Sequence, residues 1–183
     1  MESSTSEREH MILHPLLKLA TGILFFASLT SANSVSNAHL LRLFQEDQSD
    51  RDSGVFLMHR DAERRKQVEQ MIVDNLLLTA EDFYRAAVIF QHGQSPSDYK
   101  KAQQLASKAA ILKPDFIEAR WLTCAAEDRY LISIGEPQVW GTQYSGFEPS
   151  LEPINRHAKT DKEREVCGLP PLKEIEMSLE KEN

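Results

Sequence analysis

Side chains that could do chemistry gather at two predicted helix ends and in one loop. His92 and Asp128 are of the types that form general acid/base pairs, and Arg129 could orient an anionic or polar substrate. The loop at residues 138–144 adds amide side chains and backbone N–H groups. We assign no catalytic role, and His92, Asp128 and Arg129 are the candidates if the protein is an enzyme. The candidate binding set is Gln91, His92, Asp128, Arg129, Gln138, Gly141, Thr142, Gln143 and Tyr144.

Asp128 is expected to be at least partly buried, because it lies on a helical stripe that is otherwise apolar. The other members of the stripe are Ile117, Trp121, Cys124 and Leu131. A buried carboxylate needs a cation or several donors, and Arg85, His92 or the loop backbone at Gly141 could supply them. A structural role, in which Asp128 pins the loop to the helices, is favoured over catalysis. The corresponding structural role of His92 is a helix C-cap.

Several site types have no signature in this sequence. No Ser or Cys stands in a nucleophile-elbow context, and there is no P-loop or Rossmann fingerprint. The six histidines are scattered and no Cys/His spacing indicates zinc, so we expect no cofactor and no metal. Cys124 and Cys167 could pair in an exported protein. Cys124 falls inside a predicted helix, however, and a small apolar core residue is the preferred interpretation.

Two predicted helices lead to the first part of the candidate site. Apolar residues at helical spacing indicate a helix from about residue 60 to 77. Thr79 and Asp82 form a capping-box pattern that starts a second helix, which runs to about residue 91. Gly93 would end it in the left-handed C′ conformation.

Two more predicted helices lead to Asp128 and Arg129, the second part of the candidate site. Ser95, with Pro96 in the first turn, starts a third helix that Pro114 closes. A box-like cap at Asp115 starts a fourth, which runs to about residue 134. Alanines of the third helix fall near tetratricopeptide spacings, but no second copy of the repeat is found. We therefore predict an all-α compact bundle of about four main helices with a tetratricopeptide-like hairpin, a long ordered loop at 138–169 and a short C-terminal helix.

The direction of the helices brings the candidate residues together. Short connections make successive helices antiparallel, so the second and fourth helices point the same way. Their C-terminal ends, at Gln91-His92 and Asp128-Arg129, are then expected at one end of the bundle, together with the loop at 138–144.

An apolar run at residues 19–29 predicts export. Its length of about eleven residues suits a signal h-region of roughly 7 to 15 and is short of the roughly 20 needed to cross a bilayer. Small residues after it allow cleavage after Ala32 or Ala38. Acidic residues before it oppose a signal peptide unless translation starts at Met11, and an uncleaved inner-membrane anchor is the alternative. The predicted organisation is a signal peptide or anchor at 1–32, a polar linker at 33–58 and one helical domain at 59–183, in the periplasm or secreted.

The net charge disfavours some partners. The chain has 21 basic and 28 acidic residues and a charge of −7, and removal of residues 1–32 leaves −6. Binding to nucleic acid or anionic lipid needs a basic surface, so we expect no nucleic acid partner and membrane contact only through an uncleaved leader.

An ordered set of short motifs spans roughly residues 60–172. The motifs are Gln91-His-Gly93, Trp121-Leu122, Ala126-Glu-Asp-Arg129, Gly141-Thr-Gln143 and Gly168-Leu-Pro-Pro-Leu172. In this order they resemble the bacterial family called domain of unknown function 6624. The resemblance implies no activity, but it draws attention to the same bundle end as the helix directions do.

Two classes of function remain open. The leading hypothesis is a non-catalytic exported protein that binds a peptide, a protein or an envelope component at the end formed by His92, Asp128 and the 138–144 loop. The alternative is a small hydrolase or transferase that uses His92 and Asp128 as an acid/base pair, which requires both to line an open pocket. An immunity or inhibitor protein with a basic partner is a third possibility, based on size and charge alone.

Overall fold

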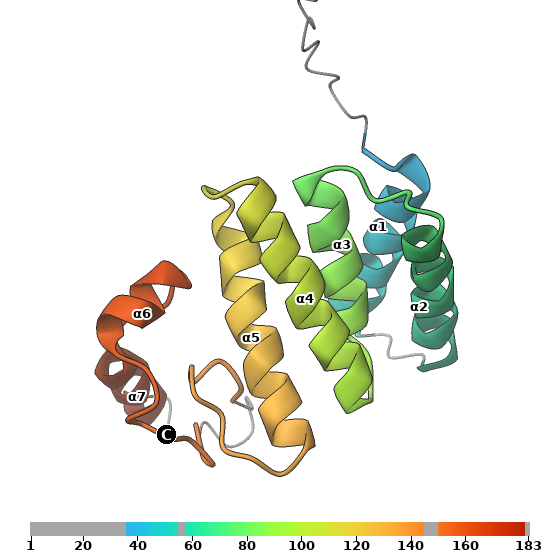
Figure 1. Cartoon of the computed structure of the whole chain (residues 1–183). Coiled ribbons are helices and arrows are strands. Elements are labelled where there is room, and N and C mark those ends of the chain that lie inside the picture. Colours follow the sequence, from blue (N-terminus) through green and yellow to red (C-terminus); the bar gives the residue numbers. More distant parts are fainter. Residues whose placement is uncertain (1–35, 55–57, 145–149, 182–183) are drawn as a thin grey trace, which may run out of the picture. The chain divides into compact units, whose positions relative to one another are not determined.

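The computed structural model describes residues 36–54, 58–144 and 150–181, which form α-helices joined by loops. The helices are α1 (Ala38–Asp52), α2 (Met58–Val73), α3 (Ala80–Gln91), α4 (Pro96–Leu112), α5 (Ile117–Ser133), α6 (Asp161–Val166) and α7 (Leu172–Lys181) (Figure 1). Within these ranges there is no strand beyond an isolated bridge between Gln138 and Ile154. The all-α prediction is confirmed. The predicted signal peptide or anchor lies outside the described residues, among which no helix has the length and apolarity to cross a membrane.

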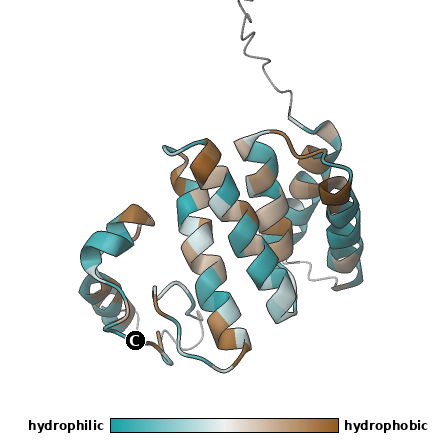
Figure 2. Ribbon diagram, viewed as in Figure 1, coloured by the Kyte–Doolittle hydropathy of each residue, from teal (hydrophilic) through white to brown (hydrophobic). Residues whose placement is uncertain are grey.

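The main core lies between α3 and its neighbours. Helices α3, α4 and α5 lie side by side, and α1 and α2 pack on the other side of α3 (Figure 1). Alanines of α3 and α4 that are fully buried, among them Ala86, Ala102 and Ala106, let these helices approach closely because they carry no bulky side chain. Hydrophilic and hydrophobic residues are mixed along α4 and α5 (Figure 2), because each helix has both buried and exposed positions.

Helix α1 occupies a range that the sequence predicts to be a polar linker, so that prediction is wrong for the residues described there. Leu40 and Leu43 are buried in the core. The acidic side chains of α1 and the arginines of α2 neutralise each other: Arg60 contacts Asp50 at 2.9 Å, and Arg64 also pairs with Asp50. The linker interpretation failed because these charges pair between helices instead of facing water.

The N-terminal caps of α3 and α4 form as predicted. Both capping boxes are present, Thr79 with Asp82 and Ser95 with Asp98. The predicted cap at Asp115 is wrong, because Phe116 is the N-cap of α5 and makes no side-chain cap hydrogen bond.

Gly93 does not adopt the left-handed conformation that the sequence predicts, since its φ is not among the positive ones. Its role is steric. A Cβ at this position would lie 2.3 Å from Cβ of Asp98, so the turn between α3 and α4 requires glycine because of close packing.

A disulfide joins α5 to the C-terminal part of the chain. Cys124 is bonded to Cys167, which corrects the preferred interpretation of Cys124 as a free core residue. Both cysteines pack with Trp140 and Leu169 in a small apolar cluster. The predicted long loop therefore contains α6 and is bonded to the bundle, while the tetratricopeptide likeness of α4 and α5 stays a prediction.

Candidate functional site

Asp128 is sealed beneath the loop and holds it in place. Its side chain is 0% exposed. Oδ1 accepts hydrogen bonds from the backbone N–H groups of Val139 (2.7 Å) and Trp140 (2.9 Å). Oδ2 accepts from the N–H (2.9 Å) and the hydroxyl (2.8 Å) of Thr142. Of the expected partners, the loop backbone binds Asp128, while His92 and Arg85 contact other groups, so the geometry favours the structural role.

Gln138, the first residue of the loop, also holds the loop in place. It is fully buried, and its Nε2 donates to the carbonyl oxygens of Gln143 (2.8 Å) and Leu151 (2.6 Å). Its Oε1 accepts from the N–H of Gln143 at 3.0 Å. All polar atoms of this side chain are therefore used within the protein, and none is left for a ligand.

A pocket of about 300 Å³ opens between the C-terminal ends of α3 and α5 and the 138–144 loop. We call it the Arg129 pocket. Its lining residues are Gln48, Tyr84, Val88, Gln91, His92, Trp121, Leu122, Arg129, Thr142, Gln143 and Tyr144. Six of the nine predicted binding residues meet here, whereas Asp128, Gln138 and Gly141 do not line it. Arg129 Nη1 donates to the carbonyl of Gln91 at 2.9 Å, so the ends of α3 and α5 adjoin as their directions predict.

Arg129 is a cation held by neutral groups only. Its Nε donates to Oε1 of Gln143 at 3.0 Å, and its guanidinium lies 5.9 Å from the ring centre of Tyr99. Within the described ranges no carboxylate pairs with it, and no Asp or Glu is among the described residues that line the pocket. Burial accordingly lowers the pKa of Arg129 from its ordinary value. A desolvated guanidinium without a counter-charge favours an anionic group in the pocket.

His92 pairs with a residue that the sequence interpretation missed. Its Nδ1 lies 2.7 Å from Oδ2 of Asp47, a side chain that is 1% exposed. A carboxylate can only accept here, so Nδ1 carries the proton and Nε2 is the nitrogen left for acid–base chemistry. Asp47 belongs to α1, and no local motif marks it. Only recognition of the 38–52 segment as a helix could have suggested this pair.

Gln91 lines the same pocket, but its acceptor oxygen is closed off. The side chain is buried, and its Oε1 has almost no exposed surface and accepts no hydrogen bond from any residue that the structure describes. A buried acceptor without a donor is unfavourable. Gln91 therefore contributes to the wall of the pocket without offering an accessible acceptor.

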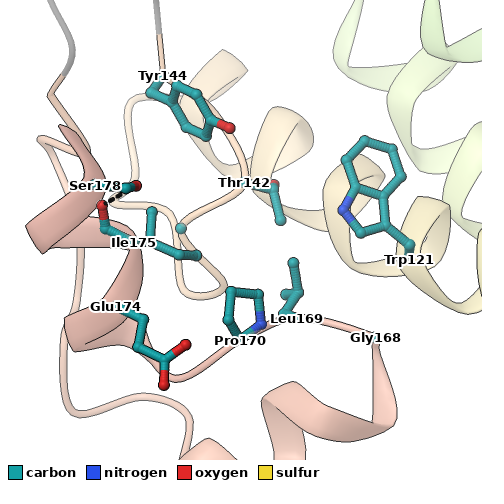
Figure 3. Close-up of a pocket in the computed structure, with 10 residues that line it drawn as sticks. Trp121, Thr142, Tyr144, Gly168, Leu169, Pro170, Glu174, Ile175 and Ser178 are labelled. Carbon is teal, nitrogen blue, oxygen red and sulfur yellow. Dashed lines mark hydrogen bonds between the residues drawn. The ribbon is translucent and has the colours of Figure 1, made fainter. Parts of the chain in front are cut away.

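A second pocket, of about 380 Å³, adjoins the first and shares Trp121, Thr142 and Tyr144 with it (Figure 3). We call it the Glu174 pocket. Its other lining residues are Gly141, Gly168, Leu169, Pro170, Glu174, Ile175 and Ser178. In the view of Figure 3, Thr142 lies between Tyr144 and Trp121, and Glu174 and Ser178 project from α7. The sequence candidates did not include residues 168–178, although the Gly168-Leu-Pro-Pro-Leu172 motif marked part of them.

Gly168 shows why that motif begins with glycine. Its φ is 70°, and a Cβ there would lie 2.9 Å from Cγ2 of Ile117. The left-handed turn and the close approach to α5 both exclude a side chain. This turn follows the disulfide and leads the chain into the wall of the Glu174 pocket.

No metal-binding cluster is formed by the His, Cys, Asp and Glu residues of the described segments. In a comparison with protein families, the model described as "Family of unknown function (DUF6624)" matches residues 54–182. This range includes α2 to α7 and the described lining residues of the Glu174 pocket, but it begins after α1 and leaves out Gln48 of the Arg129 pocket. No curated protein and no solved structure matches the chain.

Proposed function

This chain belongs to DUF6624, a family of unknown function, and we propose that it is an exported helical protein that binds a peptide or another envelope component in the Arg129 pocket. One observation carries the proposal. An open pocket at the predicted bundle end combines amide and aromatic groups with a cation, Arg129, that has no carboxylate partner among the described residues. Such walls suit the binding of a polar ligand.

Binding is preferred over catalysis because the expected machinery is occupied. Asp128 has no exposed surface, and all four of its hydrogen bonds hold the loop. Thr142 carries the one Ser or Thr hydroxyl among the described lining residues of the Arg129 pocket, and it donates to Asp128. A nucleophile needs an adjacent base, but the Asp128 carboxylate already accepts three backbone N–H groups of the loop, so its role is to hold the loop.

A second candidate function rests on the pair of His92 and Asp47. A histidine oriented by a buried carboxylate can act as a general base toward water, and Arg129 could stabilise the anionic transition state. The alternative hydrolase or transferase would therefore use Asp47 in place of Asp128. Turnover of a bound molecule by the wild-type protein, and loss of turnover with retained binding in His92→Asn, would establish it.

The disulfide supports export, and the contacts of residues 36 and 37 favour one of the two expected cleavage sites. Disulfides persist in oxidising compartments. Ser36 Oγ and the N–H of Asn37 both donate to Asp82 at 2.8 Å, and the Asn37 side chain caps α1. Cleavage after Ala38 would remove these contacts, so we propose cleavage after Ala32. Intact-mass measurement of protein from the envelope fraction tests this: a chain starting at Asn33 is expected, and a retained leader would indicate the anchored form.

The binding proposal is tested on protein purified from the envelope fraction of its host. Native mass spectrometry should find a bound molecule on the wild-type protein. Trp121→Ala and Tyr144→Ala should lose it, because these side chains line the pocket while being 43% and 56% exposed, so that truncation costs little stability. Ile111→Ala removes an exposed apolar side chain outside both pockets and is the matched control. Retention of the molecule by both pocket variants would refute the proposal.

A further inference from the structure

The Arg129 pocket and the Glu174 pocket adjoin at the 138–144 loop, and we call the two together the track. They share three lining residues, Trp121, Thr142 and Tyr144. Two of the three are exposed aromatic side chains. A ligand that fills both pockets must therefore pass over these aromatic groups, which suits an extended molecule of several linked units.

The two halves of the track have opposite charge. The Arg129 pocket has the cation Arg129 but no Asp or Glu among its described lining residues, and His92, which also lines it, is paired with Asp47. The Glu174 pocket has Glu174 but no Lys, Arg or His in the part of the chain that the structure describes. The chain as a whole is acidic, so an arginine with no acidic residue among the described residues around its pocket is opposite to the general composition.

A comparison with Arg164 shows that Arg129 is suited to a ligand. Burial lowers the pKa of both guanidinium groups. Arg164 is 1% exposed, donates to the carbonyl oxygens of Trp140 and Pro170, and lines neither pocket, so its role is to hold the chain. Arg129 is only half-buried and lines an open pocket. Guanidinium donors that its two described hydrogen bonds do not use can pair with a carboxylate.

We propose that the ligand is a short peptide segment with a free carboxyl terminus. Its carboxylate binds Arg129. The preceding residues pass over Trp121 and Tyr144 into the Glu174 pocket, where a positively charged group faces Glu174. This inference rests on the proposed binding function and specifies the chemistry of its ligand.

The probes are two pools of mixed-sequence tetrapeptides, one with free carboxyl termini and the other amidated, together with N-acetylalanine as a small carboxylate. Binding to the full-length protein is measured by calorimetric titration and by tryptophan fluorescence, to which Trp121 contributes from the track. We expect the free-acid pool to bind and the amidated pool to bind at least about tenfold more weakly, because a hydrogen-bonded charge pair is lost.

Single-residue variants test which side chains bind the peptide. Arg129→Gln should weaken the free-acid pool about tenfold or more and leave the amidated pool unchanged, and Arg129→Lys should be intermediate because it keeps the charge without the planar fork. Lys66→Gln removes an exposed cation outside both pockets and should change nothing. Glu174→Gln should weaken tetrapeptides that begin with lysine more than those that begin with N-acetylalanine.

The outcomes separate this inference from the proposed function. Equal binding of the acid and amide pools would overturn the carboxylate contact, and N-acetylalanine binding as tightly as the peptides would overturn the extended ligand. If neither pool binds while native mass spectrometry finds a molecule that Trp121→Ala loses, the inference fails and the binding function stands. If no molecule is found either, both fail.

Discussion

Replacement of Asp128 by asparagine tests whether this carboxylate holds the 138–144 loop in place. The carboxylate accepts four hydrogen bonds, two on each oxygen, from donors of the 138–144 loop. The amide that replaces the carboxylate would keep one acceptor oxygen. Its NH₂ group would face two donors and leave them unpaired in a fully buried place.

The magnitude follows from the lost hydrogen bonds. A hydrogen bond to a charged group contributes about 1.5–3 kcal/mol, so two lost bonds lower the free energy of unfolding by about 3–6 kcal/mol. This corresponds to a fall in the unfolding midpoint of about 6–24 °C for a domain of this size. Thr142→Ala removes one of the four bonds and should cost about 1.5–3 kcal/mol.

The assay is urea unfolding followed by far-UV circular dichroism, with ligand binding measured in parallel. Asp115→Asn makes the same chemical change at an exposed position before α5 and should stay within about 0.5 kcal/mol of the wild type. A loss below about 1 kcal/mol for Asp128→Asn would refute the idea that this carboxylate holds the loop. Full stability with lost turnover would instead restore Asp128 as a catalytic candidate.

Three further changes test other parts of the fold. Replacement of Cys124 and Cys167 by serine should cost about 4 kcal/mol in urea unfolding, because the bond closes a loop over a sequence separation of 43 residues; unchanged stability would contradict this. Burial acts to raise the pKa of Asp82, but hydrogen bonds, first among them that from Ser36, outweigh it and hold the pKa below 3.8. The ionised Asp82 carboxylate therefore stabilises the fold above its ordinary pKa, and this stabilisation is lost as the pH falls through the lowered pKa. Asp82→Asn should be less stable than the wild type at pH 7 and should lose less stability on acidification to pH about 2. Parallel plots of stability against pH for the two proteins would refute this. Gly93→Ala should lower the free energy of unfolding by about 1–3 kcal/mol through overpacking, and a neutral result in thermal unfolding would show that the turn can shift away from α4.

Local signals determined most of the helices. The capping boxes at Thr79 and Ser95 lie within three residues of their partners, and the apolar spacing of α3 repeats within one or two turns. Short connections then set the helix directions, which placed Gln91 and Arg129 at one end without any structural information. These features are readable because each depends on neighbours in the chain.

The features that the sequence could not predict depend on distant partners. The charged residues of 45–54 are typical of a linker in the sequence, but in the fold the arginines of α2 pack against them. Cys124 is typical of a small core residue, but in the fold Cys167, at the end of α6, is bonded to it. Distant partners also determine whether a polar side chain can bind a ligand or instead holds the fold together. Asp128 and Arg129 are adjacent in the sequence, yet the loop packs over one and leaves the other at an open pocket. The sequence alone therefore determined which end of the bundle is polar, and the tertiary packing determined which of its groups can meet a ligand, because burial depends on chain segments that lie far away in the sequence.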